Sequence, residues 1–150
     1  MIGISDKKGI PDPKLEHIFW GTVKGNGNIV SGYHCNKNFG DEKVYAEAHL
    51  YPKSKRIITL NRNQKIFEAV VRSKESKVLK SANGGKSTFY NNSWSRQDVV
   101  DCIARLEGSE KLIKKYGGYS KVRGKEICID KTTGLVVVNA RGTAFPILKY

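Results

Sequence analysis

The segment Glu16–Cys35, EHIFWGTVKGNGNIVSGYHC, holds two of the three histidines of this chain, His17 and His34. Between them lies the polar, glycine-rich run 24–28, a composition that suits a loop and cannot fill a core. Imidazole is the one side chain whose ordinary pKa lies near neutrality, so a pair can supply an acid and a base. The segment favours a loop that acts as an active-site lid, held at both ends by imidazoles. The alternative is that both histidines are structural or exposed, which is the commoner role.

The composition limits the protein to one domain with a large excess of positive charge. The 150 residues are read as an N-terminal segment, 1–12, and a single domain, 13–150. Lysine and arginine number 27 against 14 acidic residues, a net charge of +13. These residues are spread along the chain, which favours a folded basic surface that meets a polyanion. No apolar run approaches the ~20 residues of a membrane span, and we expect no export signal within the chain.

The cysteines predict neither a disulfide framework nor a zinc site. Three are present, an odd number, and they are widely separated at Cys35, Cys102 and Cys128. Cys102 and Cys128 fall within apolar segments and are expected to be small core residues.

Local patterns predict an α+β fold, with short N-terminal helices followed by mainly antiparallel sheet and one central helix. Asp12-Pro13 predicts a helix over about 13–19 that carries His17, with Asp12 as its cap. Ser95 and Asp98 form a capping-box pattern for a second helix, 95–107, whose apolar stripe is Val99, Cys102, Ile103 and Leu106. Segment 43–51 is a strand or a helical turn, and 74–83 is an exposed connection. The expected strands are 29–34, 56–61, 65–72, 86–90, 119–123, 125–130, 135–139 and 143–148.

Gly84-Gly85-Lys86-Ser87-Thr88 invites comparison with a phosphate-binding loop, but it fails two requirements. The required earlier glycine is replaced by Lys80, and the residues after Thr88 are a poor helix start. The remaining readings are a turn that feeds a strand, or a strand that carries a catalytic lysine. His17, His34 and His49 show neither HxH nor HExxH spacing, so no protein-held metal is expected.

Two histidines and a lysine are sufficient to cleave RNA without a metal. One imidazole takes the proton of a 2′-hydroxyl, and the other protonates the 5′-oxygen that leaves. A lysine stabilises the charge that develops on the non-bridging phosphate oxygens.

Four motifs, in order, resemble the EndoU family, which includes bacterial EndoU toxin domains and, more distantly, the coronavirus uridylate-specific endoribonuclease. They are His17-Ile-Phe-Trp-Gly21, Ser31-Gly-Tyr-His34, Lys86-Ser-Thr-Phe-Tyr90 leading into Trp94-Ser95, and Thr143-Ala-Phe-Pro146. The resemblance covers about residues 13–148. It implies an EndoU-like fold, of the barnase/EndoU/colicin/RelE type.

The resemblance also implies roles for particular residues. His34 would be the general base, His17 the general acid and Lys86 the third catalytic residue. The substrate contacts would be Ser87, Thr88, Tyr90, Thr143 and Phe145. Phe145 replaces the tyrosine usual in the family, which keeps a stacking ring but loses a hydroxyl, so the uridine preference is less well supported than the cleavage. His49 has no family role and is expected to be structural.

The expected protein is therefore a metal-independent endoribonuclease toxin that cleaves RNA, at uridine and with tRNA as one expected target, to a 2′,3′-cyclic phosphate. No cofactor is required, although manganese stimulation is compatible with the family. The resemblance implies a monomeric C-terminal domain of a larger secreted or cell-surface toxin, as in contact-dependent growth inhibition. It would act in the target-cell cytoplasm and be bound by an acidic immunity protein.

Two alternatives need no catalysis. The first is a basic nucleic-acid-binding domain in which aromatic residues stack on bases; its stacking residues would be Trp20, Tyr33, Phe89, Tyr90 and Phe145. The second is a protein-binding module whose basic face meets an acidic partner.

Overall fold

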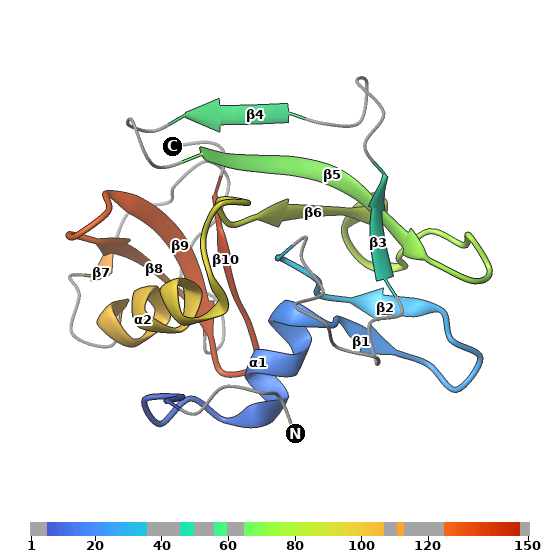
Figure 1. Ribbon diagram of the computed structural model, residues 1–150, viewed down its shortest axis with the longest axis horizontal. Helices are drawn as coiled ribbons and strands as arrows, with labels where there is room; N and C mark the ends of the chain where they lie inside the picture. The colour runs from blue at the N-terminus through green and yellow to red at the C-terminus, as the bar shows by residue number, and fades with distance from the viewer. Residues whose placement is uncertain are drawn as a thin grey trace.

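The computed structural model describes residues 6–35, 46–49, 56–59, 65–106, 111–112 and 125–147. Two α-helices and mainly antiparallel strands make up this part of the chain, which confirms the predicted α+β class. The helices are α1 (Asp12–Phe19) and α2 (Arg96–Leu106), and a 3₁₀ turn, η2, spans Ala82–Gly85 (Figure 1). The strands are β1 (Thr22–Val23), β2 (Ile29–Ser31), β3 (Ala46–His49), β4 (Arg56–Thr59), β5 (Lys65–Ser73), β6 (Lys86–Phe89), β7 (Lys111–Leu112), β8 (Lys125–Asp130), β9 (Leu135–Ala140) and β10 (Ala144–Pro146).

Helix α1 begins one residue earlier than predicted. Pro11 occupies the N-cap position and Asp12 is the first helical residue, so the prediction that Asp12 caps the helix is wrong. The Asp12 carboxylate instead forms an ion pair with Lys7 at 2.5 Å. An acidic residue in the first turn still interacts favourably with the helix dipole. Leu15, Ile18 and Phe19 are buried, and they anchor the helix in the core.

Helix α2 has the capping box that the sequence predicts. The Ser95 backbone N–H donates to the Asp98 carboxylate at 2.8 Å, and the Asp98 N–H donates to the Ser95 hydroxyl at 3.1 Å. These bonds satisfy two donors at the start of the helix. The predicted apolar stripe is fully buried; its members are Val99, Cys102, Ile103 and Leu106.

Most predicted strands are present. One antiparallel sheet has the order β10-β9-β8-β7; in the other, β5 pairs with β3, β4 and β6. The ambiguous segment 43–51 contains strand β3, and the predicted strand 119–123 lies outside the described residues. Strands β1 and β7 were not predicted. The predicted exposed connection 74–83 is exposed over residues 74–79, but Lys80 is buried.

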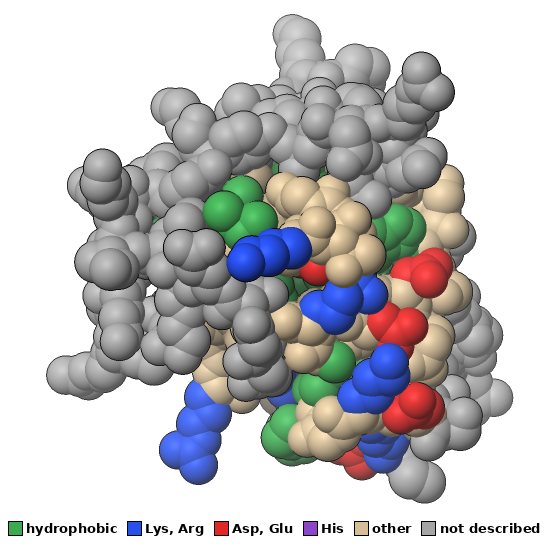
Figure 2. All heavy atoms as spheres, turned by 90° about the vertical axis from the view of Figure 1, so that its left-hand side faces the viewer, with side chains coloured by type: hydrophobic (Ala, Val, Ile, Leu, Met, Phe, Trp, Pro, Cys, Tyr) green, Lys and Arg blue, Asp and Glu red, His purple; other side chains and the backbone are tan. Residues whose placement is uncertain are grey.

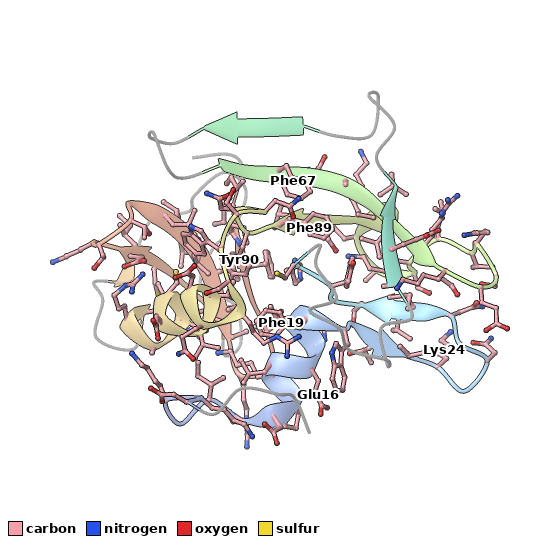
Figure 3. The ribbon with its side chains drawn as sticks, viewed as in Figure 1. Glu16, Phe19, Lys24, Phe67, Phe89 and Tyr90 are labelled. Atoms are coloured by element: carbon pink, nitrogen blue, oxygen red, sulfur yellow. The ribbon has the colours of Figure 1, made fainter. Side chains whose placement is uncertain are left out.

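Strand β6 ties the two larger sheets together. The Thr88 hydroxyl donates to the Pro146 carbonyl at 2.6 Å, and the Tyr90 hydroxyl donates to the Ala144 carbonyl at 2.7 Å. The Tyr90 N–H also donates to the His34 carbonyl at 3.0 Å. Figure 3 shows Phe67 and Phe89 side by side in the core, where their rings stack with centroids 4.8 Å apart. Chain segments distant in sequence therefore converge on β6.

The glycine-rich run 24–28 is a hairpin turn between β1 and β2. The Lys24 N–H donates to the Asn28 carbonyl at 2.9 Å, which closes the turn, and the Ser76 hydroxyl donates to the Asn28 side chain at 2.8 Å. Figure 3 places Lys24 at the outer end of the hairpin. None of these turn residues lines the pocket described below, and the run forms a closed turn rather than a cover over that pocket in this structure.

The positive charge is partly balanced by neighbouring acids. Figure 2 shows one face on which lysine and arginine side chains lie beside aspartate and glutamate, with no described histidine visible. Helix α2 contributes two ion pairs, Lys8–Asp101 at 3.0 Å and Arg105–Asp130 at 2.9 Å. No helix in the described part of the chain is both long and apolar enough to cross a membrane.

Candidate active site

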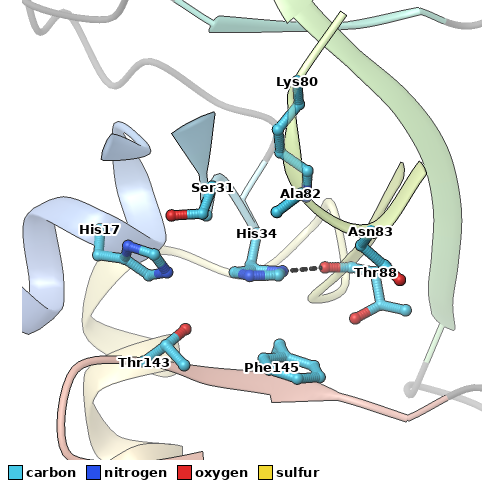
Figure 4. Close-up of a pocket in the computed structure, with 10 residues that line it drawn as sticks. His17, Ser31, His34, Lys80, Ala82, Asn83, Thr88, Thr143 and Phe145 are labelled. Carbon is cyan, nitrogen blue, oxygen red and sulfur yellow. Dashed lines mark hydrogen bonds between the residues drawn. The ribbon is translucent and has the colours of Figure 1, made fainter. Parts of the chain in front are cut away.

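A pocket of about 370 Å³ lies where α1, β2, η2, β6 and β10 meet. It contains both histidines of the opening segment together with a lysine (Figure 4). The lining residues are His17, Ser31, Gly32, His34, Lys80, Ala82, Asn83, Thr88, Thr143 and Phe145.

His34 is held in the neutral form with one nitrogen available to the pocket. Its side chain is only 6% exposed, and its Nδ1 donates to the Thr88 carbonyl at 2.7 Å. A carbonyl can only accept, so the neutral ring keeps its proton on Nδ1 and a lone pair on Nε2. Burial, and then the charges of Lys80 and His17, lower the pKa of His34 to about 3 against the opposing effect of the Thr88 hydrogen bond. His34 therefore has the state that a general base needs at neutral pH.

Phe145 supports the His34 ring. The two rings stack with centroids 5.0 Å apart and an interplanar angle of 17°. His34 therefore covers one face of Phe145, and that face cannot stack on a base as the sequence predicted. Phe145 also packs against the apolar cluster formed by Ile127, Val136, Val138 and Ile147.

His17 lies opposite His34, near the end of α1. The ring centroids are 6.3 Å apart, and Figure 4 shows the His17 ring directed toward His34 across the pocket. The Nδ1 atom of His17 is 2.8 Å from the Thr22 hydroxyl. Burial, and then the charge of Lys80, lower the pKa of His17. The two imidazoles thus face one space from opposite sides, as an acid and a base must.

Gly32 allows the two histidines to approach. Its φ is +85°, and a Cβ atom there would lie 2.4 Å from the His17 carbonyl oxygen and 3.0 Å from His17 Nδ1. We expect Gly32→Ala to destabilise the fold and to displace the His17 ring. Gly27 has the same φ with nothing within 4 Å of its Cβ position, so Gly27→Ala carries the backbone strain without the contact. Chemical denaturation and RNA cleavage should both show a larger loss for Gly32→Ala, and equal losses would contradict the steric account.

Lys80 supplies the positive charge of the pocket. It is 5% exposed, its Nζ donates to the Ser87 hydroxyl, and that hydroxyl donates to the Gly32 carbonyl at 2.9 Å. An ammonium has three donors, and in the described part of the chain Ser87 takes one of them. Burial lowers the pKa of Lys80 to about 8, so most molecules keep this charge at neutral pH. A buried ammonium group whose remaining N–H donors face a pocket can bind an anion there.

Lys86, the lysine that the resemblance implied, is not among the residues that line the pocket. It begins β6 with an exposed side chain and pairs with Val70 of β5. The cause lies in η2, where Asn83, Gly84 and Gly85 all have positive φ and turn the chain between the two lysines. Lys80 therefore points inward and Lys86 outward. The Gly84-Gly85 pair was a visible turn signal, but nothing in the sequence indicated which lysine would be buried.

The other predicted substrate contacts divide into two groups. Thr88, Thr143 and Phe145 line the pocket, whereas Ser87 and Tyr90 do not. Ser87 is 1% exposed and is occupied by Lys80 and Gly32, and Tyr90 is fully buried with its hydroxyl on Ala144. Both side chains are buried and form hydrogen bonds within the protein, and neither reaches the pocket. The pocket residues that the sequence did not indicate as substrate contacts are Ser31, Gly32, Lys80, Ala82 and Asn83.

The donor types of the pocket suit proton transfer. Within the described residues, no group of three or more histidine, cysteine, aspartate or glutamate side chains is arranged to hold a metal ion.

Comparison of the chain with protein-family models, with curated proteins and with solved structures finds no match.

Proposed function

We propose that this protein is an endoribonuclease that cleaves RNA without a metal, by attack of the 2′-hydroxyl on the adjacent phosphate. One observation carries the proposal. A buried neutral His34, an opposing His17 and a buried Lys80 line one pocket. This arrangement supplies a base, an acid and a fixed positive charge around the space that a phosphodiester would fill. The same chemistry is implied by the resemblance to the EndoU family.

In the proposed reaction, Nε2 of His34 removes the 2′-hydroxyl proton and the 2′-oxygen attacks phosphorus. The bond from phosphorus to the 5′-oxygen breaks, and that oxygen takes a proton from Nε2 of His17. The products are a 2′,3′-cyclic phosphate and a free 5′-hydroxyl, and His34 finishes protonated while His17 finishes neutral. Lys80 interacts with the non-bridging oxygens, whose charge increases in the transition state.

The proposed partners follow from charge and from the family resemblance. The +13 charge favours association with RNA, and it favours an acidic immunity protein that covers the pocket. We propose that the domain is delivered as part of a larger toxin and acts as a monomer in the target-cell cytoplasm. Because His34 covers one face of Phe145, we propose no uridine contact at that face.

A cleavage assay tests the proposal. End-labelled RNA should be cut in the presence of excess chelator, and the upstream fragment should end in a 2′,3′-cyclic phosphate. RNA that is bound but not cut would favour a non-catalytic nucleic-acid-binding domain. Loss of cleavage in chelator, restored by one metal, would favour a metallonuclease.

The pH dependence of kcat/KM should reveal the free-enzyme pKa values of the two imidazoles. His34 must be neutral, so activity should rise as pH rises through about 3. His17 must be protonated, and its pKa lies below 6.5, so activity should fall as pH rises through that lowered value. The optimum is therefore expected on the acid side of pH 6.5, with a further fall near 8 as Lys80 loses its proton. A profile of kcat/KM that keeps rising from pH 6.5 to 8 would contradict these roles.

A further inference from the structure

The two imidazoles differ in the group that holds their Nδ1 atoms. His34 Nδ1 faces the Thr88 carbonyl at 2.7 Å, whereas His17 Nδ1 faces the Thr22 hydroxyl at 2.8 Å. A carbonyl can only accept a hydrogen bond, but a hydroxyl can accept or donate. The partner of His34 thus enforces one neutral tautomer. The partner of His17 can hold the ring whether Nδ1 carries a proton or not.

We propose that Thr22 is a positioning residue for the acid of the reaction. Its hydroxyl occupies Nδ1 of His17 in both charge states, so that Nε2 is the nitrogen that exchanges a proton in the pocket. The inference rests on the proposed ribonuclease function, because it assigns Thr22 a role through His17.

The surroundings of His17 support this role. The ideal Cβ position of Gly32 lies 3.0 Å from both Nδ1 and Cε1 of His17, so the chain at Gly32 and the Thr22 hydrogen bond both border the Nδ1 edge of the ring. Thr22 is exposed and does not line the pocket, which separates it from direct contact with substrate there. Burial and then the charge of Lys80 lower the pKa of His17, and His34 is a second titratable group across the pocket. No carboxylate in the described part of the chain opposes that effect on His17.

A neutral hydroxyl does not offset the lowering of the His17 pKa by burial and by the charge of Lys80. A carboxylate at the same position would accept from Nδ1 and favour the charged ring, which typically moves a pKa by about one to three units. Thr22→Asp should therefore raise the pKa of His17 and move the alkaline limb of kcat/KM to higher pH. Thr22→Ser retains the hydroxyl and should retain the wild-type profile.

The test combines histidine NMR with kinetics on the full chain. ¹⁵N chemical shifts of the His17 ring give its pKa and tautomer without any RNA, so this arm does not depend on the proposed function. We expect Thr22→Val to alter the pKa and the tautomer of His17 and to lower kcat/KM by about 10- to 100-fold. That is the usual loss when a residue that orients a metal-binding histidine is removed. Thr132→Val, on an exposed residue of the β8–β9 turn, is the matched control and should change neither.

The outcomes are distinguishable. Wild-type kcat/KM in Thr22→Val, or an unchanged His17 pKa in both Thr22→Val and Thr22→Asp, would overturn the role of Thr22. Shifts of the His17 resonances in these variants, with no cleavage of RNA by the wild-type protein, would support the contact between Thr22 and the ring and overturn the ribonuclease proposal.

Discussion

Replacing His34 is expected to lower the rate of RNA cleavage by about 10²- to 10⁴-fold, the usual effect of removing a general acid or base. His34→Gln is the sharper variant, because its amide can still donate to the Thr88 carbonyl and fill much of the ring volume, yet it cannot take a proton at neutral pH. His17→Ala should cause a loss of the same order. Initial rates of cleavage of end-labelled RNA measure the loss in each variant, and circular dichroism shows whether each variant is folded. Full activity in a folded variant would remove that histidine from the mechanism.

Acid unfolding gives an independent measure of His34. Its pKa in the folded protein is about 3, below the ordinary 6.5, so between these values the unfolded chain binds more protons. Stability should therefore fall as pH falls from 6.5 toward 3, by up to about 1.4 kcal/mol per pH unit from this one group. His34→Gln should lack that contribution. Identical pH slopes in denaturant titrations of the two proteins would mean that His34 is not buried in its neutral form.

Replacing Lys80 is expected to lower kcat by about 10²- to 10³-fold, the usual effect of losing one group that stabilises transition-state charge. Lys80→Met removes the ammonium while filling the buried space, and kcat is measured with saturating RNA. Lys86→Met is the matched control six residues later, because Lys86 is exposed and does not line the pocket. It should change KM slightly, through the loss of one surface charge, and leave kcat near wild type.

The comparison of the two lysines also tests the electrostatics of the pocket. Burial lowers the pKa of both histidines most, and the charge of Lys80 lowers both further, so Lys80→Met should raise both pKa values and Lys86→Met should raise neither. A larger loss of kcat in Lys86→Met than in Lys80→Met would reverse the assignment of the catalytic lysine.

Elements with strong local signals could be predicted from the sequence. Helix α2 has both a capping box and an apolar stripe, and both patterns depend on residues within one or two turns of each other. Strands β5, β8 and β9 are short segments rich in isoleucine and valine and bounded by turn residues, and their bounds differ from the predicted ones by no more than one residue. His17 and His34 were identified because a histidine has few alternatives as an acid or a base near neutral pH.

The rest of the site depends on contacts between distant segments. Lys80 is buried because η2 turns the chain inward, and its partner Ser87 is fixed by the Gly32 carbonyl, 55 positions away in sequence. The polar composition of residues 74–83 predicted an exposed connection, and it gave no indication that Lys80 would contact Ser87. Tyr90 was predicted at the substrate site, but its hydroxyl donates to the Ala144 carbonyl between the two sheets, a contact that local sequence likewise did not indicate. Sequence patterns identify such residues as polar or aromatic but do not indicate which partner they meet.

The most direct test of the account replaces one oxygen of the substrate. An RNA that the protein cuts at a known position is compared with the same strand carrying a 2′-deoxynucleotide on the 5′ side of that bond. Attack by the 2′-hydroxyl predicts that cleavage at this bond is abolished, while other bonds are still cut to fragments that end in a 2′,3′-cyclic phosphate. Continued cleavage at the deoxy position, or fragments that begin with a 5′-phosphate, would show that water attacks instead and would contradict the roles given to His34 and His17.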